Sequence, residues 1–374
     1  MRLGKIRISH YINYAVIGLL TLVLGIMTLA GNRFDNSLLF LLEKVAISII
    51  LAISLSLVVG FLGELSLGHA GFMCVGAYLG GKVASLLVPT MGNGLGAFAI
   101  ALVVGAAAAA VCGVIIGIPA LRLRGDYLAI VTLAFGEIVK TLFQNTSDES
   151  FGGTLGLSTP RYDKKYLFII AFVLVLVTLA IVQNFIRSKH GRAVTAIRDN
   201  EIAAKATGIN VTKYKLIAFI TSAALAGVAG VLYSYSNYTV QSAKFDYNYS
   251  IEILVMVVLG GMGNINGSIV AAALITWLNT WLPTVLTGEM AVLQDLLYAM
   301  ILIVIVIYNN APALKGFRDK YNLSVLVDKL RRADPSHIKD DKAKWDVVPT
   351  KISMDEILSI DLTPQDNQNN GGDK

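Results

Sequence analysis

The chain has 374 residues, of which 55% are hydrophobic and 15% are charged, and its mean hydropathy is +0.66. Soluble globular proteins carry about 25% charged residues, so this composition excludes a soluble globule and predicts an integral membrane protein. The net charge of +6 belongs to residues 1–314, because residues 315–374 hold 11 basic and 11 acidic side chains. The basic excess therefore indicates orientation in a membrane rather than nucleic-acid binding. Two cysteines and four scattered histidines predict no disulfide framework, no metal site and no cofactor.

Apolar segments recur along the chain, most of them close to the ~20 residues that a bilayer-spanning helix needs. A first segment follows Arg2, Lys5 and Arg7, and it is longer than the ~7 to 15 apolar residues of a signal peptide, which favours an uncleaved helix. We expect an all-α polytopic membrane helix bundle of about ten transmembrane or partly spanning helices. These cover residues 14–30, 37–60, 70–88, 95–120, 127–143, 166–186, 214–235, 251–260, 268–286 and 293–309.

The short connections between these segments differ in basic charge. With the N-terminus inside, 12 Lys and Arg residues lie on the cytoplasmic side and five lie outside. The positive-inside rule therefore predicts that both termini are cytoplasmic. The basic stretch at 315–320 suits the surface of a bacterial-type inner, cytoplasmic membrane with anionic lipid. The predicted domains are an N-terminal segment with the first helix (1–36), a membrane domain (37–310) and a polar cytoplasmic tail (311–374), whose end we expect to be disordered.

A polar, basic stretch at 187–215 interrupts the apolar pattern. Asp199 or Asn200 can cap a short helix that begins at Glu201 and ends at Gly208. Glu201 and Lys205 are spaced to pair on this helix, and its alanines leave one side small. One interpretation is an ordinary basic cytoplasmic loop. The other is a docking helix that inserts into a cleft on a soluble partner.

Two glycine-rich stretches, at 61–81 and 259–268, break the apolar pattern about 200 residues apart. Interrupted membrane helices in corresponding places indicate a transport route in an internally repeated fold. The alternative is that the glycines only allow close helix packing, and both interpretations can hold together.

Few ionisable residues lie within the apolar segments, where each is costly and is functional by default. Glu137 and Lys140 are spaced to pair with each other, whereas Lys82 has no evident partner. Glu64, Ser66 and His69 lie beside the first glycine stretch, where they could line a pathway or cap a helix end. The connection at 144–165 has a composition typical of a loop rather than a strand.

Several stretches resemble one family when taken in order: GELSLGHAGFMCVGAY, RLRGDYLAIVTLAFGEIV, GGTLGL, HGRAVTAIRDNEIAAKATGINVTKYK and LGGMGNINGS. They are similar to the LivM-type permeases of high-affinity branched-chain amino acid ABC importers, over roughly residues 40–310. Within them, the short helix resembles the EAA loop with which such permeases contact their ATPases, although the usual downstream proline is missing. Position 64 also departs from the family, where glutamine is common instead of glutamate.

The resemblance implies a permease subunit without covalent chemistry, whose partners are a second LivH-type permease, two cytoplasmic ATPases, an extracytoplasmic binding protein and the lipid bilayer. Neither enzymatic activity nor nucleic-acid binding is expected. The substrates implied are leucine, isoleucine and valine. We assign ATPase coupling to Arg198, Asp199, Glu201, Ala203, Ala204 and Gly208. We assign the translocation pathway to Glu64, Ser66, His69, Gly71, Glu137, Gly260, Gly261, Gly263 and Asn264.

Three alternatives remain open at this point. Related importers for urea, amides or sugars share the architecture. An ion-coupled secondary transporter would use Glu64, His69 and Glu137 as a relay. An intramembrane enzyme would use Glu64 and His69, but the sequence offers no second catalytic constellation. The sequence does not determine the exact substrate or the residues that line the pathway. It also does not determine whether the chain pairs with a second copy or with a related permease, or what the tail does.

Overall fold

The computed structural model describes residues 35–285 except 93, 124, 161 and 163, together with residues 14, 17, 18, 21, 25, 296, 299, 300, 303 and 307. The predicted helices at 14–30 and 293–309 lie almost wholly outside the described residues, and the predicted tail at 311–374 lies wholly outside them.

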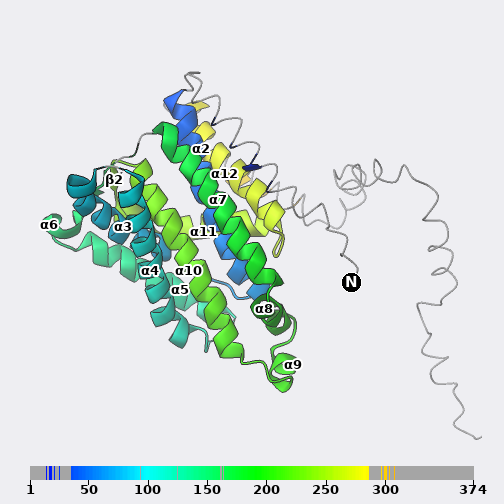
Figure 1. Cartoon of the computed structure of the whole chain (residues 1–374). Coiled ribbons are helices and arrows are strands. Elements are labelled where there is room, and N and C mark those ends of the chain that lie inside the picture. Colours follow the sequence, from blue (N-terminus) through cyan, green and yellow to red (C-terminus); the bar gives the residue numbers. More distant parts are fainter. Residues whose placement is uncertain are drawn as a thin grey trace, which may run out of the picture. The chain divides into compact units, whose positions relative to one another are not determined.

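Helices dominate the described part of the chain (Figure 1). The long ones are α2 (Asn36–Ser56), α3 (His69–Met91), α4 (Leu95–Ala120), α5 (Asp126–Gln144), α7 (Lys164–Arg187), α10 (Val211–Ser236) and α12 (Ile265–Val285). The shorter ones are α6 (Asp148–Phe151), α8 (Lys189–Asp199), α9 (Glu201–Ala206) and α11 (Tyr247–Gly260). A π-helix, η2 (Leu57–Leu62), continues α2, and a 3₁₀ turn, η3 (Ser242–Lys244), precedes α11.

Six of these helices are long and apolar enough to cross a bilayer: α2 with η2, α3, α4, α7, α10 and α12. The sequence predicts eight apolar segments in this part of the chain, and all eight are helical. The other two are less apolar or shorter than these six: α5 carries Glu137 and Lys140, and α11 has 14 residues, which extend about 21 Å. A polytopic helix bundle is therefore confirmed, whereas a count of about ten is not.

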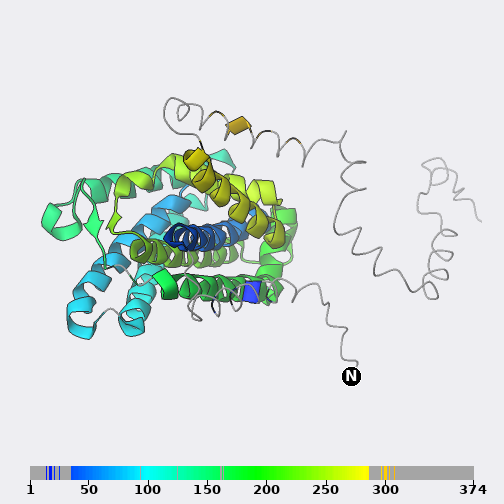
Figure 2. The ribbon, with the colours of Figure 1, turned by 90° about the horizontal axis from the view of Figure 1, so that it is seen from above.

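Helix α2 lies at the centre of the bundle, with other helices on several sides of it (Figure 2). In the most apolar 18-residue segment of α2 and η2 taken together, 89% of the residues are buried. In the corresponding segment of α4, only 22% are buried. The exposed side of α4 carries Val103, Val111 and Ile115, as expected for a surface that faces lipid or another apolar chain.

Glycines let α3 pack closely against α10 and against α5. A methyl group placed on Gly76 of α3 would lie 2.3 Å from the carbonyl oxygen of Gly227 on α10. Gly71 is similarly close to Gly136 of α5, where the added carbon would lie 2.8 Å from the Cα atom. The packing role predicted as an alternative for the first glycine stretch therefore holds for these two positions.

The two ends of the bundle differ in structure. Helices α8 and α9 lie at one end, and β2 and α6 lie at the other (Figure 1). At the second end, β1 (Leu157–Ser158) pairs antiparallel with β2 (Thr239–Val240). The prediction of loop rather than strand at 144–165 is wrong for β1, because a two-residue strand depends on a partner 82 residues away rather than on its own composition. Nearby, Lys82 donates a 3.3 Å hydrogen bond to the carbonyl oxygen of Glu149.

Candidate coupling site

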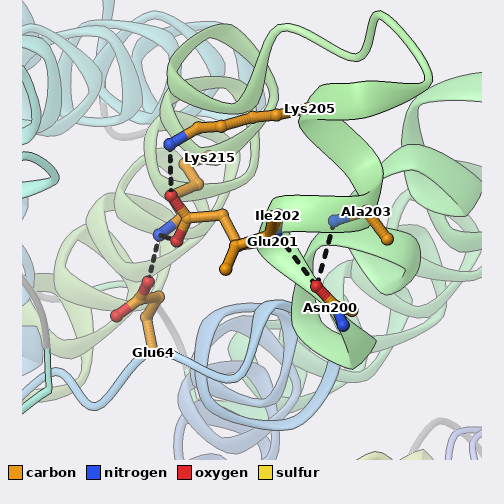
Figure 3. Close-up of polar contacts among 7 residues, drawn as sticks. All are labelled: Glu64, Asn200, Glu201, Ile202, Ala203, Lys205 and Lys215. Carbon is orange, nitrogen blue, oxygen red and sulfur yellow. Dashed lines mark hydrogen bonds and ion pairs between the residues drawn. The ribbon is translucent and has the colours of Figure 1, made fainter.

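The polar stretch at 187–215 contains the starts of three consecutive helices, and a polar side chain caps each of them. The side chain of Ser188 accepts a hydrogen bond at the start of α8, that of Asn200 at α9 and that of Asn210 at α10. The Asn200 oxygen accepts from the amides of Ile202 and Ala203, each at 3.0 Å (Figure 3). Asn200 rather than Asp199 is thus the cap, and each cap satisfies amides that the first helical turn leaves unpaired.

Gly208 ends α9 in the left-handed conformation that the sequence predicts, with φ at +83°. The amide of Gly208 donates to the carbonyl of Lys205, and the amide of Ile209 donates to that of Ala204. These bonds satisfy carbonyls at the helix end, and a side chain at position 208 would strain the turn. Helix α9 is therefore a short, defined element with fixed ends.

Four charged side chains form a chain of contacts from α9 into the bundle (Figure 3). Lys205 lies 2.8 Å from one carboxylate oxygen of Glu201, which confirms the predicted pair. Lys215 of α10 lies 3.3 Å from the other Glu201 oxygen and 2.5 Å from an oxygen of Glu64. We call these four residues the ionic chain. It connects the surface helix to the segment that follows η2.

Burial increases along the ionic chain from Lys205 to Lys215, and Glu64 is also largely buried. The side chain of Lys205 is 54% exposed and that of Glu201 is 26% exposed, whereas Glu64 is 13% and Lys215 only 5% exposed. The hydrogen bond from Lys205 lowers the pKa of the Glu201 carboxyl below its ordinary value of 4.5; desolvation opposes this shift, and the charge of Lys215 supports it. At neutral pH, Glu201 is therefore an anion held between two lysines.

Arg198 makes a second connection between this site and the bundle. Its guanidinium donates two hydrogen bonds to one oxygen of Asp199, at 3.0 and 3.2 Å. A third hydrogen bond, of 3.0 Å, reaches the carbonyl oxygen of Gly60 in η2. The side chain also covers Gly63, where an added carbon would lie 2.6 Å from the Arg198 Cγ atom. Arg198 thus holds the end of α8 against the π-helix.

The second glycine stretch packs against Gly60, which lies one residue before the first stretch and beside Arg198. A carbon added to Gly60 would lie 2.5 Å from the backbone nitrogen of Gly263, so the two backbones are almost in contact. Gly261 and Gly263 both have positive φ, and Asn264 accepts from the amide of Gly267 at the start of α12. Gly260 and Gly267 are close enough that neither has room for a side chain. The structure therefore joins η2 to the second predicted interruption in one tight junction.

The other predicted pathway residues do not share one site. Glu64 belongs to the ionic chain, whereas His69 is buried and its Nε2 atom lies 2.7 Å from the hydroxyl of Ser54. Gly71 packs against α5, as described above. Glu137 pairs with Lys140, as the spacing predicts, and accepts a 3.1 Å hydrogen bond from the Tyr247 amide. The described part of the chain gives the buried hydroxyl of Ser66 no hydrogen-bond partner.

The six residues assigned to coupling lie on or beside α8 and α9, but they differ in exposure. Ala204 faces inward at 4% exposed, so it lets α9 lie close to its own bundle. Ala203 and Gly208 are exposed. Sequence reasoning missed Ile202, which is 80% exposed, although an isoleucine on a short polar helix was a usable signal. It also missed Lys215, a lysine just inside an apolar segment.

Among the described residues, no group of three or more histidine, cysteine, aspartate or glutamate side chains could hold a metal ion. The site instead contains a short exposed helix, α9, that is linked to Glu64 by the ionic chain, and Arg198 of α8 bonds to Gly60 at a tight backbone junction. Together with the apolar spans, this arrangement defines a helical membrane protein of the transporter class, in which a surface element is attached to the membrane core.

The chain belongs to the family described as the permease component of the branched-chain amino acid transport system, which matches residues 37–306. The high-affinity branched-chain amino acid transport permease LivM of Salmonella typhimurium is 37% identical over 261 residues, which are 61% of this chain and 60% of the relative. The chain thus aligns with about three fifths of the length of that relative.

Two further relatives are more distant. The ribose import permease RbsC of Escherichia coli is 29% identical over 321 residues, 79% of this chain and 92% of the relative. A probable branched-chain amino acid permease LivH of Methanocaldococcus jannaschii is 30% identical over 142 residues, 38% of this chain and 44% of the relative. No solved structure matches the chain. The relatives are transport permeases rather than enzymes, and membership of this family makes the chain a membrane-embedded permease component.

Proposed function

We propose that the chain is a permease subunit of an ATP-driven importer for branched-chain amino acids. In this assignment it pairs with a second LivH-type permease, two ATPases bind on the cytoplasmic side, one of them at α9, and an extracytoplasmic binding protein delivers leucine, isoleucine or valine. Both termini lie in the cytoplasm, residues 37–310 form the permease domain and residues 311–374 form a cytoplasmic tail. Support comes from the similarity to LivM and LivH and from the basic charge around α9.

The observation that carries the coupling role is the exposure of Ile202 on a helix that is otherwise fixed at both ends. An exposed apolar side chain of this size is suited to a cleft on a partner protein. Movement of α9 would displace Glu201 and, through Lys215, the Glu64 segment. Arg198 would transmit the same displacement to Gly60, so that nucleotide-driven motion reaches the glycine junction as a rigid-body shift.

The experiment compares Ile202→Asp with Leu155→Asp in the full chain, expressed together with its ATPase, second permease and binding protein. Leu155 is a matched control, because it is 73% exposed and lies between α6 and β1 at the other end of the bundle. An aspartate near the start of α9 is compatible with the helix, so the change removes an apolar contact without unfolding α9.

We expect Ile202→Asp to reduce ATPase copurification and amino-acid uptake by about tenfold or more, the effect typical of losing an apolar anchor. Leu155→Asp should leave both at the wild-type level. Normal copurification and uptake with Ile202→Asp would contradict the docking role of α9.

A second candidate function is sugar import, because the ribose permease matches over 92% of its own length. Uptake measurements with labelled leucine and labelled ribose in the same cells separate the two. We expect leucine to accumulate in an ATP-dependent manner and ribose not to accumulate. The opposite pattern would replace the amino-acid assignment by the sugar one.

A further inference from the structure

A cavity of about 460 Å³ lies away from the coupling site. It is lined by residues of α2, α10, η3, α11 and α12, among them Tyr233 near the end of α10. Lys215 and Tyr233 lie on the same helix, about 27 Å apart along its axis. The cavity therefore belongs to the end of the bundle opposite α9. Its volume is in the range of small-molecule sites.

Three charged side chains line this cavity: Lys44 of α2, Lys244 of η3 and Glu252 of α11. In the part of the chain that the structure describes, none of the three has an ion-pair partner within 4.0 Å. Glu252 accepts a hydrogen bond from the Asn279 amide, which orients its carboxylate. Lys44 lies 4.6 Å above the ring of Phe40. The cavity thus contains two cations and one oriented anion that are not paired with each other.

A buried hydroxyl supplies an independent observation. Thr276 of α12 lines the same cavity, is 6% exposed, and its hydroxyl has no hydrogen-bond partner among the described residues. Buried polar groups are nearly always hydrogen-bonded to protein, water or ligand. A donor or acceptor from a bound molecule would satisfy this hydroxyl.

The rest of the lining is largely apolar and aromatic, with Phe40, Ile47 and Phe245 beside Tyr233 and Tyr249. A second cavity of about 470 Å³ shares Lys244, Tyr249 and Glu252 with the first, so Lys244 and Glu252 border both spaces. Fixed charges next to an apolar surface match a ligand that is charged at one end and apolar at the other.

We propose that this cavity is a substrate-binding site for a zwitterionic α-amino acid with an apolar side chain. Lys44 and Lys244 bind its carboxylate, Glu252 binds its ammonium group, and the aromatic lining contacts its side chain. The inference rests on the proposed function and extends it, because it places a transit site for the substrate within this permease. A ribose molecule would leave all three charges unpaired, which disfavours it as a ligand here.

The test uses the assembled transporter in detergent without its binding protein, and measures binding of radiolabelled L-leucine. The variants are Glu252→Gln and Lys44→Met, and Lys82→Met is the matched control, because Lys82 is a half-buried lysine of α3 that does not line the cavity. We expect each cavity variant to weaken leucine binding by about tenfold or more, as loss of a charged hydrogen bond does. The control should bind normally.

Two leucine analogues test which cavity residue binds the carboxylate of the ligand and which binds its ammonium group. Leucine amide lacks the carboxylate and 4-methylpentanoate lacks the ammonium group. Glu252→Gln should weaken leucine and leucine amide but leave 4-methylpentanoate unchanged. Lys44→Met should weaken leucine and 4-methylpentanoate but leave leucine amide unchanged. This crossed pattern would not arise from general damage to the fold, and copurification of the ATPases verifies that each variant assembles.

The outcomes separate the site from the function. If the wild type imports leucine and both variants bind and import it normally, the cavity is not a substrate site and the proposed function stands. If the wild type neither binds nor imports any branched-chain amino acid, the proposed function and the site both fail. The crossed pattern together with wild-type leucine uptake supports both.

Discussion

The two ends of this helix bundle treat their charged residues in opposite ways. At the coupling end, Glu64, Glu201, Lys205 and Lys215 satisfy one another in the ionic chain. At the cavity end, Lys44, Lys244 and Glu252 line one space, and none of them has an ion-pair partner among the described residues. Charges that already have partners can hold a structure or transmit a movement. Charges at the edge of a cavity that have no opposite charge within ion-pair distance are available to a ligand.

The ends also differ in packing. At the coupling end, Gly60 and Gly263 bring two backbones almost into contact, with no room for a methyl group. At the cavity end, about 460 Å³ remains open among the side chains. A tight junction passes on displacements because packed groups cannot absorb them, whereas an open cavity can change its occupant without moving the helices.

The largest loss of stability is expected from a mutation that breaks the ionic chain. Lys215→Met leaves the largely buried Glu64 carboxylate without a cation, so we expect stability to fall by about 3 kcal/mol. Lys44→Met removes a charge that has no ion-pair partner among the described residues and should cost at most about 1 kcal/mol, for its contact with Phe40. Chemical unfolding of the purified full chain in detergent measures both.

A compensating change sharpens this comparison. Adding Glu64→Gln to Lys215→Met removes the unpaired buried charge and should recover part of the lost stability. Equal losses for Lys215→Met and Lys44→Met would show that the two ends do not differ as described.

The next effect concerns the glycine junction. Gly60→Ala places a methyl group 2.5 Å from the Gly263 nitrogen, so the backbones must separate. We expect a loss of about 1 to 3 kcal/mol in stability, with reduced uptake. Gly96→Ala is the control, because its methyl group would meet only the Met91 side chain at 3.8 Å. Thermal unfolding and uptake measured side by side test this, and equal behaviour of the two variants would contradict a tight junction.

The smallest effect is the pH dependence of Glu201. Because its pKa is lowered in the folded chain, its carboxylate contributes stability above its ordinary value of 4.5 and loses that contribution as the pH falls through the lowered value. The difference in unfolding midpoint between the wild type and Glu201→Gln should be constant near neutral pH and vanish in acid below pH 4.5. A difference in unfolding midpoint that grows toward acid pH would show that folding raises the pKa of Glu201 rather than lowering it.

Local patterns in the sequence predicted local structure well. The eight apolar segments in the described part of the chain are helices, Gly208 ends α9, and the Glu201–Lys205 and Glu137–Lys140 pairs form at their helical spacing. Each of these features depends on groups no more than a few residues apart, where helix geometry fixes which side chains meet. The resemblance of several stretches to LivM-type permeases was confirmed by the family match to residues 37–306.

Features that depend on distant segments were not visible in the sequence. The short strand β1 exists only because β2 lies beside it, and the pathway residues scattered because Glu64 and His69 face different neighbours. Nothing in the apolar patterning distinguishes Lys44 from Lys140, although one borders a cavity and the other has a carboxylate partner.

The sequence by itself determined a membrane-embedded helix bundle, the position of its polar stretch and the ends of α9, because composition, caps and spacing act within a helix turn or two. Only the tertiary structure decided that Lys215 meets Glu64 across 151 residues, that Gly60 packs against Gly263 of the second glycine stretch, and that Lys44, Lys244 and Glu252 share a cavity. These contacts arise from how the helices pack side by side, and side-chain packing between distant segments leaves no periodic signal along the chain.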